Sequence, residues 1–284
     1  MASPSIRPAW RRAAWFLLGS LAVACGAGSG ERLKPWPRPD WEPGGEKAML
    51  FFLVYGDAEV KTGPLGHYGT AGIPPGFRAA QVVLSSNPCV IFRDTPSWSD
   101  FQKSHPDVAE AIGKSAKCTV FRGEIEDSKN LDYLRDVVGS ITYSLDHGGI
   151  AVYDLITFRW WTARDWKERA FPAQDSALGT QIAHNMSDDD SHPGTFWHYT
   201  HGLRKFGRPD LSVHGAVPEN HKKIGEVIKR LAEWEVAGKV FHDGQRLQGP
   251  DLPAGLVVHL QGGMDDVNFN NAHWEIEWPG LGHP

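Results

Sequence analysis

Residues 48–55 read AMLFFLVY, an unbroken apolar run as long as a typical β-strand. A run without polar alternation predicts a central strand that is buried on both faces of its sheet. Two helix patterns follow: residues 99–113, which Pro106 divides because proline interrupts a helix, and residues 128–146, where aliphatic residues recur at helical spacing. A short strand pattern starting at Cys118 lies between them. The first half therefore reads as alternating strands and helices, as in β-α-β units.

The other patterns are shorter. Residues 77–86 fit either a helix or a strand, and we expect a helix because several of their apolar residues share one helical face. Residues 218–237 form the clearest helix pattern in the chain. An Asp-Gly pair within residues 240–247 signals a hairpin. In residues 272–278, Trp and Ile alternate with Glu, which predicts an antiparallel strand with one apolar and one solvated face.

Together these patterns predict an α+β fold. We expect mixed sheets with helices packed on one face, β-α-β units in the first half and antiparallel hairpins in the second. The expected domain organisation is a signal peptide over residues 1–24, a flexible Gly- and Pro-rich linker over residues 25–46, and a globular α+β domain over residues 47–284. That domain can divide into two halves, about residues 47–175 and 190–284.

The N-terminus has the pattern of an export signal. Arg7, Arg11 and Arg12 precede an apolar run over residues 13–24, and no acidic residue occurs before Cys25. As a helix, an apolar run of this length rises only about 18 Å, which is too short to span a bilayer. We therefore expect the first 24 residues to be removed on export.

The residues before Cys25 leave the type of processing open. Ala22-Val23-Ala24 suits ordinary signal-peptide cleavage. The cysteine that follows also resembles the lipobox of bacterial lipoproteins, Leu-small-small-Cys, although the leucine here is one position early, at Leu21. The resemblance implies a lipid on Cys25 and attachment to a membrane. We expect lipidation, with plain secretion or a retained anchor as the alternatives.

Two further cysteines, Cys89 and Cys118, each begin a strand pattern that ends in Phe-Arg. If the two strands are parallel neighbours, the thiols lie at the same level, and an oxidising compartment permits a disulfide between them. The alternative, which we favour because parallel neighbours are poor disulfide geometry, is a pair of buried thiols.

Charge and motif content exclude several classes of protein. With 29 basic and 34 acidic residues the formal charge is −5, so no basic field favours a nucleic-acid partner. No apolar run reaches the 18 residues of a membrane span, which excludes a polytopic membrane protein. The nucleophile elbow, the zinc-protease motif, the phosphate loop and the dinucleotide fingerprint are all missing. We predict no cofactor, and no catalytic residue can be assigned.

The most unusual segment reads WHYTHGLRKFGRPD and contains four candidate ligand-binding residues, His198, His201, Arg204 and Arg208. It resembles a Thr-x-Gly-Leu/Met-x-x-Phe-Gly-x-Pro-Asp/Glu-Leu segment of uncharacterised bacterial proteins that are grouped as a domain of unknown function. The matching positions are Thr200, Gly202, Leu203, Phe206, Gly207, Pro209, Asp210 and Leu211. The resemblance implies a shared α+β fold and assigns no activity.

A metal centre is one interpretation of this segment, with His192, Asp188 or Asp190 joining His198 and His201 as ligands. Histidines three residues apart share a face only in a helix, whereas in a strand they point to opposite faces. The flanking Tyr and Thr favour a strand. We therefore predict no metal and interpret these side chains as surface and loop polar groups.

Anion binding is a second interpretation, because Arg204, Lys205 and Arg208 concentrate positive charge that suits carboxylate or phosphate groups. We favour a structural role instead, in which Arg208 pairs with Asp210 or with an interior carboxylate and fixes a turn.

These observations predict an exported, lipid-anchored envelope protein that binds a partner or has a structural role without catalysis. It would be held at the membrane by Cys25, or secreted or periplasmic, with an envelope protein or a glycan as partner. The alternative is a hydrolase or metal-dependent enzyme acting on an envelope polymer, centred on residues 198–208 with the loop 56–76 as a lid. One concave pocket holding all four candidate side chains would favour the enzyme. Histidines on opposite faces would favour the binding or structural role.

Overall fold

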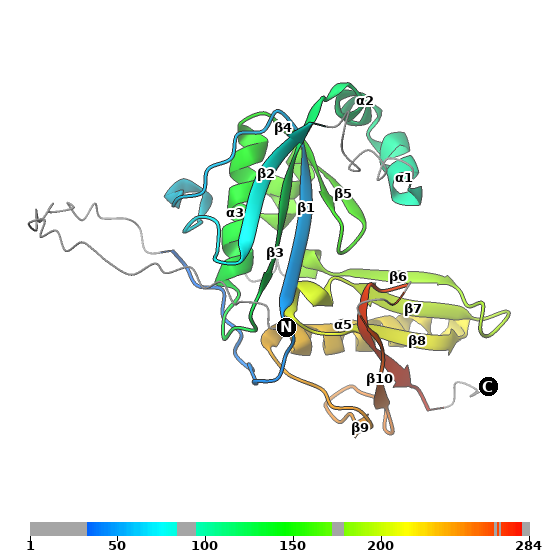
Figure 1. Cartoon of the computed structure of the whole chain (residues 1–284). Coiled ribbons are helices and arrows are strands. Elements are labelled where there is room, and N and C mark those ends of the chain that lie inside the picture. The colour runs from blue at the N-terminus through cyan, green and yellow to red at the C-terminus, as the bar shows by residue number, and fades with distance from the viewer. Residues whose placement is uncertain (1–32, 84–94, 172–178, 264–265, 267, 280–284) are drawn as a thin grey trace, which may run out of the picture. The chain divides into compact units, whose positions relative to one another are not determined.

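The described part of the chain contains two β-sheets with helices packed against them (Figure 1). The computed structural model describes residues 33–83, 95–171, 179–263, 266 and 268–279. The first sheet has the strand order β2-β3-β1-β4-β5, and the second has the order β6-β7-β8-β11-β10-β9. The strands are β1 Ala48–Gly56, β2 Phe77–Val83, β3 Lys117–Ile125, β4 Gly149–Asp154, β5 Arg159–Thr162, β6 Ala183–Asp188, β7 Phe196–His201, β8 Asp210–Ala216, β9 Gln245–Arg246, β10 Val257–Gly263 and β11 Asn271–Glu277. The helices are α1 Pro96–Ser104, α2 Pro106–Lys114, α3 Asp132–Asp146, α4 Ala163–Asp165 and α5 His221–Ala237, with short turns η1 Gly66–Tyr68, η4 Trp166–Ala170, η6 Leu203–Phe206 and η7 Pro218–Asn220.

The apolar run forms β1, at the centre of the first sheet. β1 pairs antiparallel with β3 on one side and with β4 on the other. It is buried on both faces: Leu50, Phe52 and Val54 belong to one core cluster, and Leu53 and Tyr55 belong to another. Because β3 and β4 both run against β1, they are parallel to each other. α3 connects them, which makes a β-α-β unit with β1 inserted between its strands.

Helices cover both faces of the first sheet (Figure 1). α3 is buried along nearly its whole length, because the loop over residues 57–76 packs against it as well as the sheet. In that loop Tyr68 meets the ring of Tyr143 edge-on at 5.4 Å, and the Ala71 N–H donates a hydrogen bond to Asp136. The loop that we considered as a lid is therefore a cover for α3.

The second sheet is mixed and is covered by α5. β8 and β11 are parallel neighbours, and the other strand pairs of this sheet are antiparallel. Ile224, Ile228 and Leu231 of α5 join the same core cluster as the α3 face of the first sheet. Trp274 and Ile276 of β11 point into this cluster, whereas the intervening glutamates lie on the opposite face.

The α+β fold is confirmed, with an antiparallel first sheet and a mixed second sheet. α5 covers one face of its sheet as expected, and the first sheet carries helices on both faces. Two local predictions are wrong. Residues 77–83 form an edge strand instead of a helix, because pairing with β3 along the whole segment outweighs a weak helical pattern. The Asp-Gly pair turns the chain, but β9 after it pairs with β10 and not with residues 240–242.

Residues 33–46 are part of the fold, in contrast to the flexible linker expected over residues 25–46. Arg38 is 3% exposed, and its guanidinium donates hydrogen bonds to Asp127 and to four main-chain carbonyl groups. Trp36 is buried in the main core cluster. Proline excludes a helix here, but an extended Pro-rich backbone can still bury its few large side chains.

Several predictions lie outside the described residues. Residues 1–32, with Cys25, and residues 84–94, with Cys89, are among them. The export signal, the lipid and the disulfide therefore stay predictions, and Cys118 is buried in β3. Within the part of the chain that is described, no helix has the length and apolar character needed to cross a membrane.

Candidate functional site

The segment with the motif resemblance connects the end of β7 to the start of β8. Hydrogen bonds to the Asp210 carboxylate hold it in place. Its Oδ1 accepts hydrogen bonds from the Thr200 hydroxyl at 3.0 Å and from the Leu203 N–H at 3.2 Å. Its Oδ2 accepts one from the Asn271 amide at 2.9 Å. Leu203 and Phe206 are completely buried. The motif positions named here therefore build a turn and fill the core.

Lys205, within the same turn, is also completely buried. Its Nζ lies 2.6 Å from Oδ2 of Asp154 and 3.0 Å from Oε1 of Gln181. Burial lowers the pKa of Lys205, and the charge of Asp154 opposes this shift. The contact between Lys205 and Asp154 links the turn to β4 of the first sheet. Because Lys205, Asp154 and Gln181 are all buried, they are not open to a ligand.

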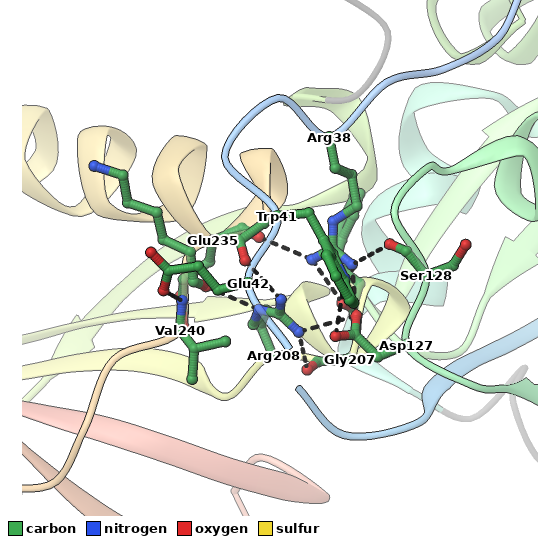
Figure 2. Close-up of polar contacts among 12 residues, drawn as sticks. Arg38, Trp41, Glu42, Asp127, Ser128, Gly207, Arg208, Glu235 and Val240 are labelled. Atoms are coloured by element: carbon green, nitrogen blue, oxygen red, sulfur yellow. Dashed lines mark hydrogen bonds and ion pairs between the residues drawn. The ribbon is translucent and has the colours of Figure 1, made fainter. Parts of the chain in front are cut away.

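The two candidate arginines are held by contacts within the fold, and Figure 2 shows those of Arg208. Arg208 is 2% exposed, and its guanidinium donates to Oδ1 of Asp127 at 3.2 Å and to three main-chain carbonyl groups. The interior carboxylate expected as the partner of Arg208 is therefore Asp127. Asp210, the other expected partner, instead accepts hydrogen bonds from Thr200, Leu203 and Asn271. Arg204 donates to the carbonyl of Asn270. With these donors engaged, Arg208 is not available to an external anion.

β7 places His198 and His201 on opposite faces, as a spacing of three residues in a strand requires. Nε2 of His201 lies 2.9 Å from the Asn268 carbonyl, and Nδ1 lies 3.2 Å from the Asn185 amide. His198 is on the α5 side, with Nδ1 3.1 Å from Nε2 of His184. Burial and the two neighbouring histidines lower the pKa of His198 to about 4, so this imidazole is neutral near pH 7. The structure does not bring the four candidate residues into one site.

A cavity of about 850 Å³ lies beside α5, between that helix, the start of β6 and residues 36–39. This volume is within the range of small-molecule binding sites. Its walls are mainly aromatic, proline and aliphatic side chains: Trp36, Pro37, Pro39, Ile182, Ile228 and Val236.

Few polar groups reach this cavity. His184 and Thr200 line it from β6 and β7, and Lys229 and Glu233 come from the exposed side of α5. Gly225 of α5 lies beside His184: a Cβ placed there would be 3.4 Å from the imidazole. A larger side chain at Gly225 would therefore project toward the histidine and into the cavity.

The residues of the cavity were not predicted as a site. Trp36 falls within the expected linker, and His184 lies in a strand without a strong pattern. The sequence signal at this cavity is Gly225, since a glycine inside a strong helix pattern costs stability relative to alanine.

Comparison with protein-family models, curated proteins and solved structures finds no match to this chain. The resemblance to bacterial proteins of unknown function therefore stays a prediction.

Proposed function

We propose that this chain is an exported, lipid-anchored envelope protein that works as a non-catalytic binding module, with the cavity beside α5 as its ligand site. The observation that carries the proposal is a cavity of about 850 Å³ whose walls are mainly apolar and which few polar groups reach. A concave, mainly apolar surface of this kind favours a small ligand with an apolar body. One polar group on the ligand can bond to His184.

The arrangement of the four predicted residues supports binding over catalysis. His198 and His201 lie on opposite faces of one sheet, and Arg208 is bonded to Asp127 and to main-chain carbonyls. An enzyme centred on these side chains would need them in one concave pocket.

A fluorescent apolar probe, N-phenyl-1-naphthylamine, tests the cavity. We expect saturable fluorescence enhancement with the wild-type protein, and about tenfold weaker binding, or 1.4 kcal/mol, in Gly225→Leu, because the added side chain projects into the cavity beside His184. Glu226→Leu is the matched control: it adds the same side chain at the next position, where α5 is exposed. Absence of saturable binding, or equal binding by both variants, would contradict the proposed site.

The anchor is tested separately. Labelling cells with a radioactive fatty acid should mark the wild-type chain in the envelope fraction and leave Cys25→Ala unlabelled. An unlabelled wild-type chain would remove the anchor from the proposal and leave the cavity untouched. Crosslinking in the envelope fraction then identifies the partner.

A further inference from the structure

The turn between β6 and β7 brings three metal-binding side chains together. Asp189, which is 3% exposed, has its Oδ2 3.1 Å from Nδ1 of His192 and 3.0 Å from Nδ1 of His214. His214 alternates along β8 with the core residue Val213, so it lies on the sheet face opposite α5. The three ligand atoms all lie within 4.8 Å of one another.

We propose that Asp189, His192 and His214 bind one divalent transition-metal ion, with zinc as the best fit. Two imidazoles and one carboxylate are a common zinc ligand set. Zinc bonds to these atoms are about 2.0–2.2 Å long, and a tetrahedral arrangement then separates neighbouring ligand atoms by about 3.3 Å. The separations of 3.0 and 3.1 Å from the carboxylate oxygen are close to that value.

The hydrogen bonding of Asp189 supports a cation at this point. Oδ2 also accepts the Gly215 N–H at 2.8 Å, and Oδ1 accepts the Ser191 N–H at 2.9 Å. Three nitrogen atoms thus lie within 3.1 Å of Oδ2, although such an oxygen has only two lone pairs. A single metal ion would satisfy both imidazole nitrogens and the carboxylate, while the two N–H groups keep the carboxylate in place.

The surroundings of His214 are a second, independent observation. Its Nε2 faces Oε2 of Glu275 at 3.9 Å, and its ring stacks on the indole of Trp197, with 5.1 Å between centroids and 6° between planes. A histidine that binds a metal through one nitrogen commonly directs the other toward a carboxylate. Trp197 and Glu275 therefore hold His214 with Nδ1 aimed at Asp189.

The cluster is also accessible to an ion. The side chains of His192 and His214 are 23% and 29% exposed, which leaves room for a water as the fourth ligand. Of the ligands considered from the sequence, only His192 takes part. Asp189 takes the place expected for Asp188 or Asp190, because it is the aspartate that the turn directs inward.

Titration of zinc into the metal-free chain, purified without a polyhistidine tag and followed by calorimetry, tests the site. We expect one zinc per chain with a dissociation constant below about 10 µM, and a weakening of about 100-fold in His192→Ala. His192 is in a partly exposed turn, so its loss should leave the fold intact, which the melting curve without metal checks. Cobalt added in place of zinc should give the visible absorption bands of a tetrahedral site.

His242→Ala is the matched control, because it removes an exposed histidine that belongs neither to the cluster nor to the cavity lining. It should bind zinc as the wild type does. The proposal is overturned if the wild-type chain binds no zinc, or if His192→Ala binds it as tightly as His242→Ala. This outcome is independent of the cavity, since the probe experiment does not involve Asp189, His192 or His214.

Discussion

Arg208 and Arg38 share a single carboxylate oxygen. Arg208 donates to Oδ1 of Asp127 at 3.2 Å, and Arg38 donates to the same atom at 2.7 Å (Figure 2). Both guanidinium groups also donate to main-chain carbonyls at the end of α5 or just after it. The two arginines therefore add side-chain hydrogen bonds to the carbonyls at the helix end, and their charge suits the negative end of the helix dipole.

Replacing the shared carboxylate tests this arrangement. Among the described residues, Asp127 is the acidic residue that forms an ion pair with both Arg38 and Arg208. Asp127→Asn removes this negative charge. Two buried positive charges would then repel each other, and we expect a loss of about 3 kcal/mol in the free energy of unfolding, measured in urea. Glu126→Gln is the control, because its ion pair with Lys47 is exposed and should contribute less than about 1 kcal/mol. Equal effects of the two substitutions would contradict the structural role of Asp127.

The parts of the fold that the sequence predicts are those whose pattern is complete within one segment. β1 and α5 are of this kind, because an apolar run or a helical stripe needs no information about its partner. β2 is an edge strand, and its conformation depends on the pairing with β3. Residues 33–46 are held by acceptors far away in the chain, so their composition alone suggests a linker.

The roles of the candidate site residues could not be predicted for the same reason, because they depend on partners far away in the sequence. The charge of Arg208 is visible in the sequence, but its partner Asp127 is 81 positions away and has no local signal. Three consecutive aspartates precede His192, and nothing in their spacing indicates that Asp189 is the buried one. Residue type and local density identify an unusual segment, whereas its role depends on long-range contacts.

Gly207→Ala tests the turn after η6. Gly207 has φ of +65°, which an alanine adopts only with strain, and an added Cβ would lie 2.2 Å from the main-chain oxygen of Glu46. We expect a loss of at least about 2 kcal/mol in unfolding free energy. Gly113→Ala, in α2, meets no atom within 4 Å and should be neutral or stabilising by less than about 1 kcal/mol. Thermal and urea unfolding measure both variants, and equal stability of Gly207→Ala and Gly113→Ala would contradict the steric role of Gly207.

Lys205→Met tests the buried ion pair. The substitution leaves Asp154 charged and enclosed, so we expect about 3–5 kcal/mol of destabilisation in urea unfolding. The double variant Lys205→Met/Asp154→Asn removes both charges and should recover part of that loss. If the double variant is destabilised by the sum of the two single effects, the charges do not interact, and the proposed link between the turn and β4 is wrong.

Glu235→Gln tests a buried acid in α5 through the pH dependence of stability. Oε1 of Glu235 accepts a hydrogen bond from the Trp274 indole at 3.0 Å, and Oε2 has no hydrogen-bond partner among the described residues. Burial raises the pKa of Glu235 well above its ordinary value of 4.5. The folded protein therefore binds this proton more tightly than the unfolded chain does. The contribution of Glu235 to the free energy of unfolding is therefore fully present below pH 4.5. It falls by about 1.4 kcal/mol per pH unit as the pH rises from 4.5 toward the pKa of the folded protein.

Glutamine cannot ionise, so Glu235→Gln should lack this contribution. The unfolding free energy of the wild type minus that of the variant should decrease as the pH rises above 4.5, whatever constant offset the amide introduces. Glu233→Gln is the control, because its side chain is 58% exposed on the same helix and should leave the pH dependence of the wild type nearly unchanged. Urea unfolding at half-unit steps from pH 4 to pH 8 measures all three proteins. A difference between wild type and Glu235→Gln that stays constant or increases with pH would mean that Glu235 ionises as readily in the folded protein as in the unfolded chain.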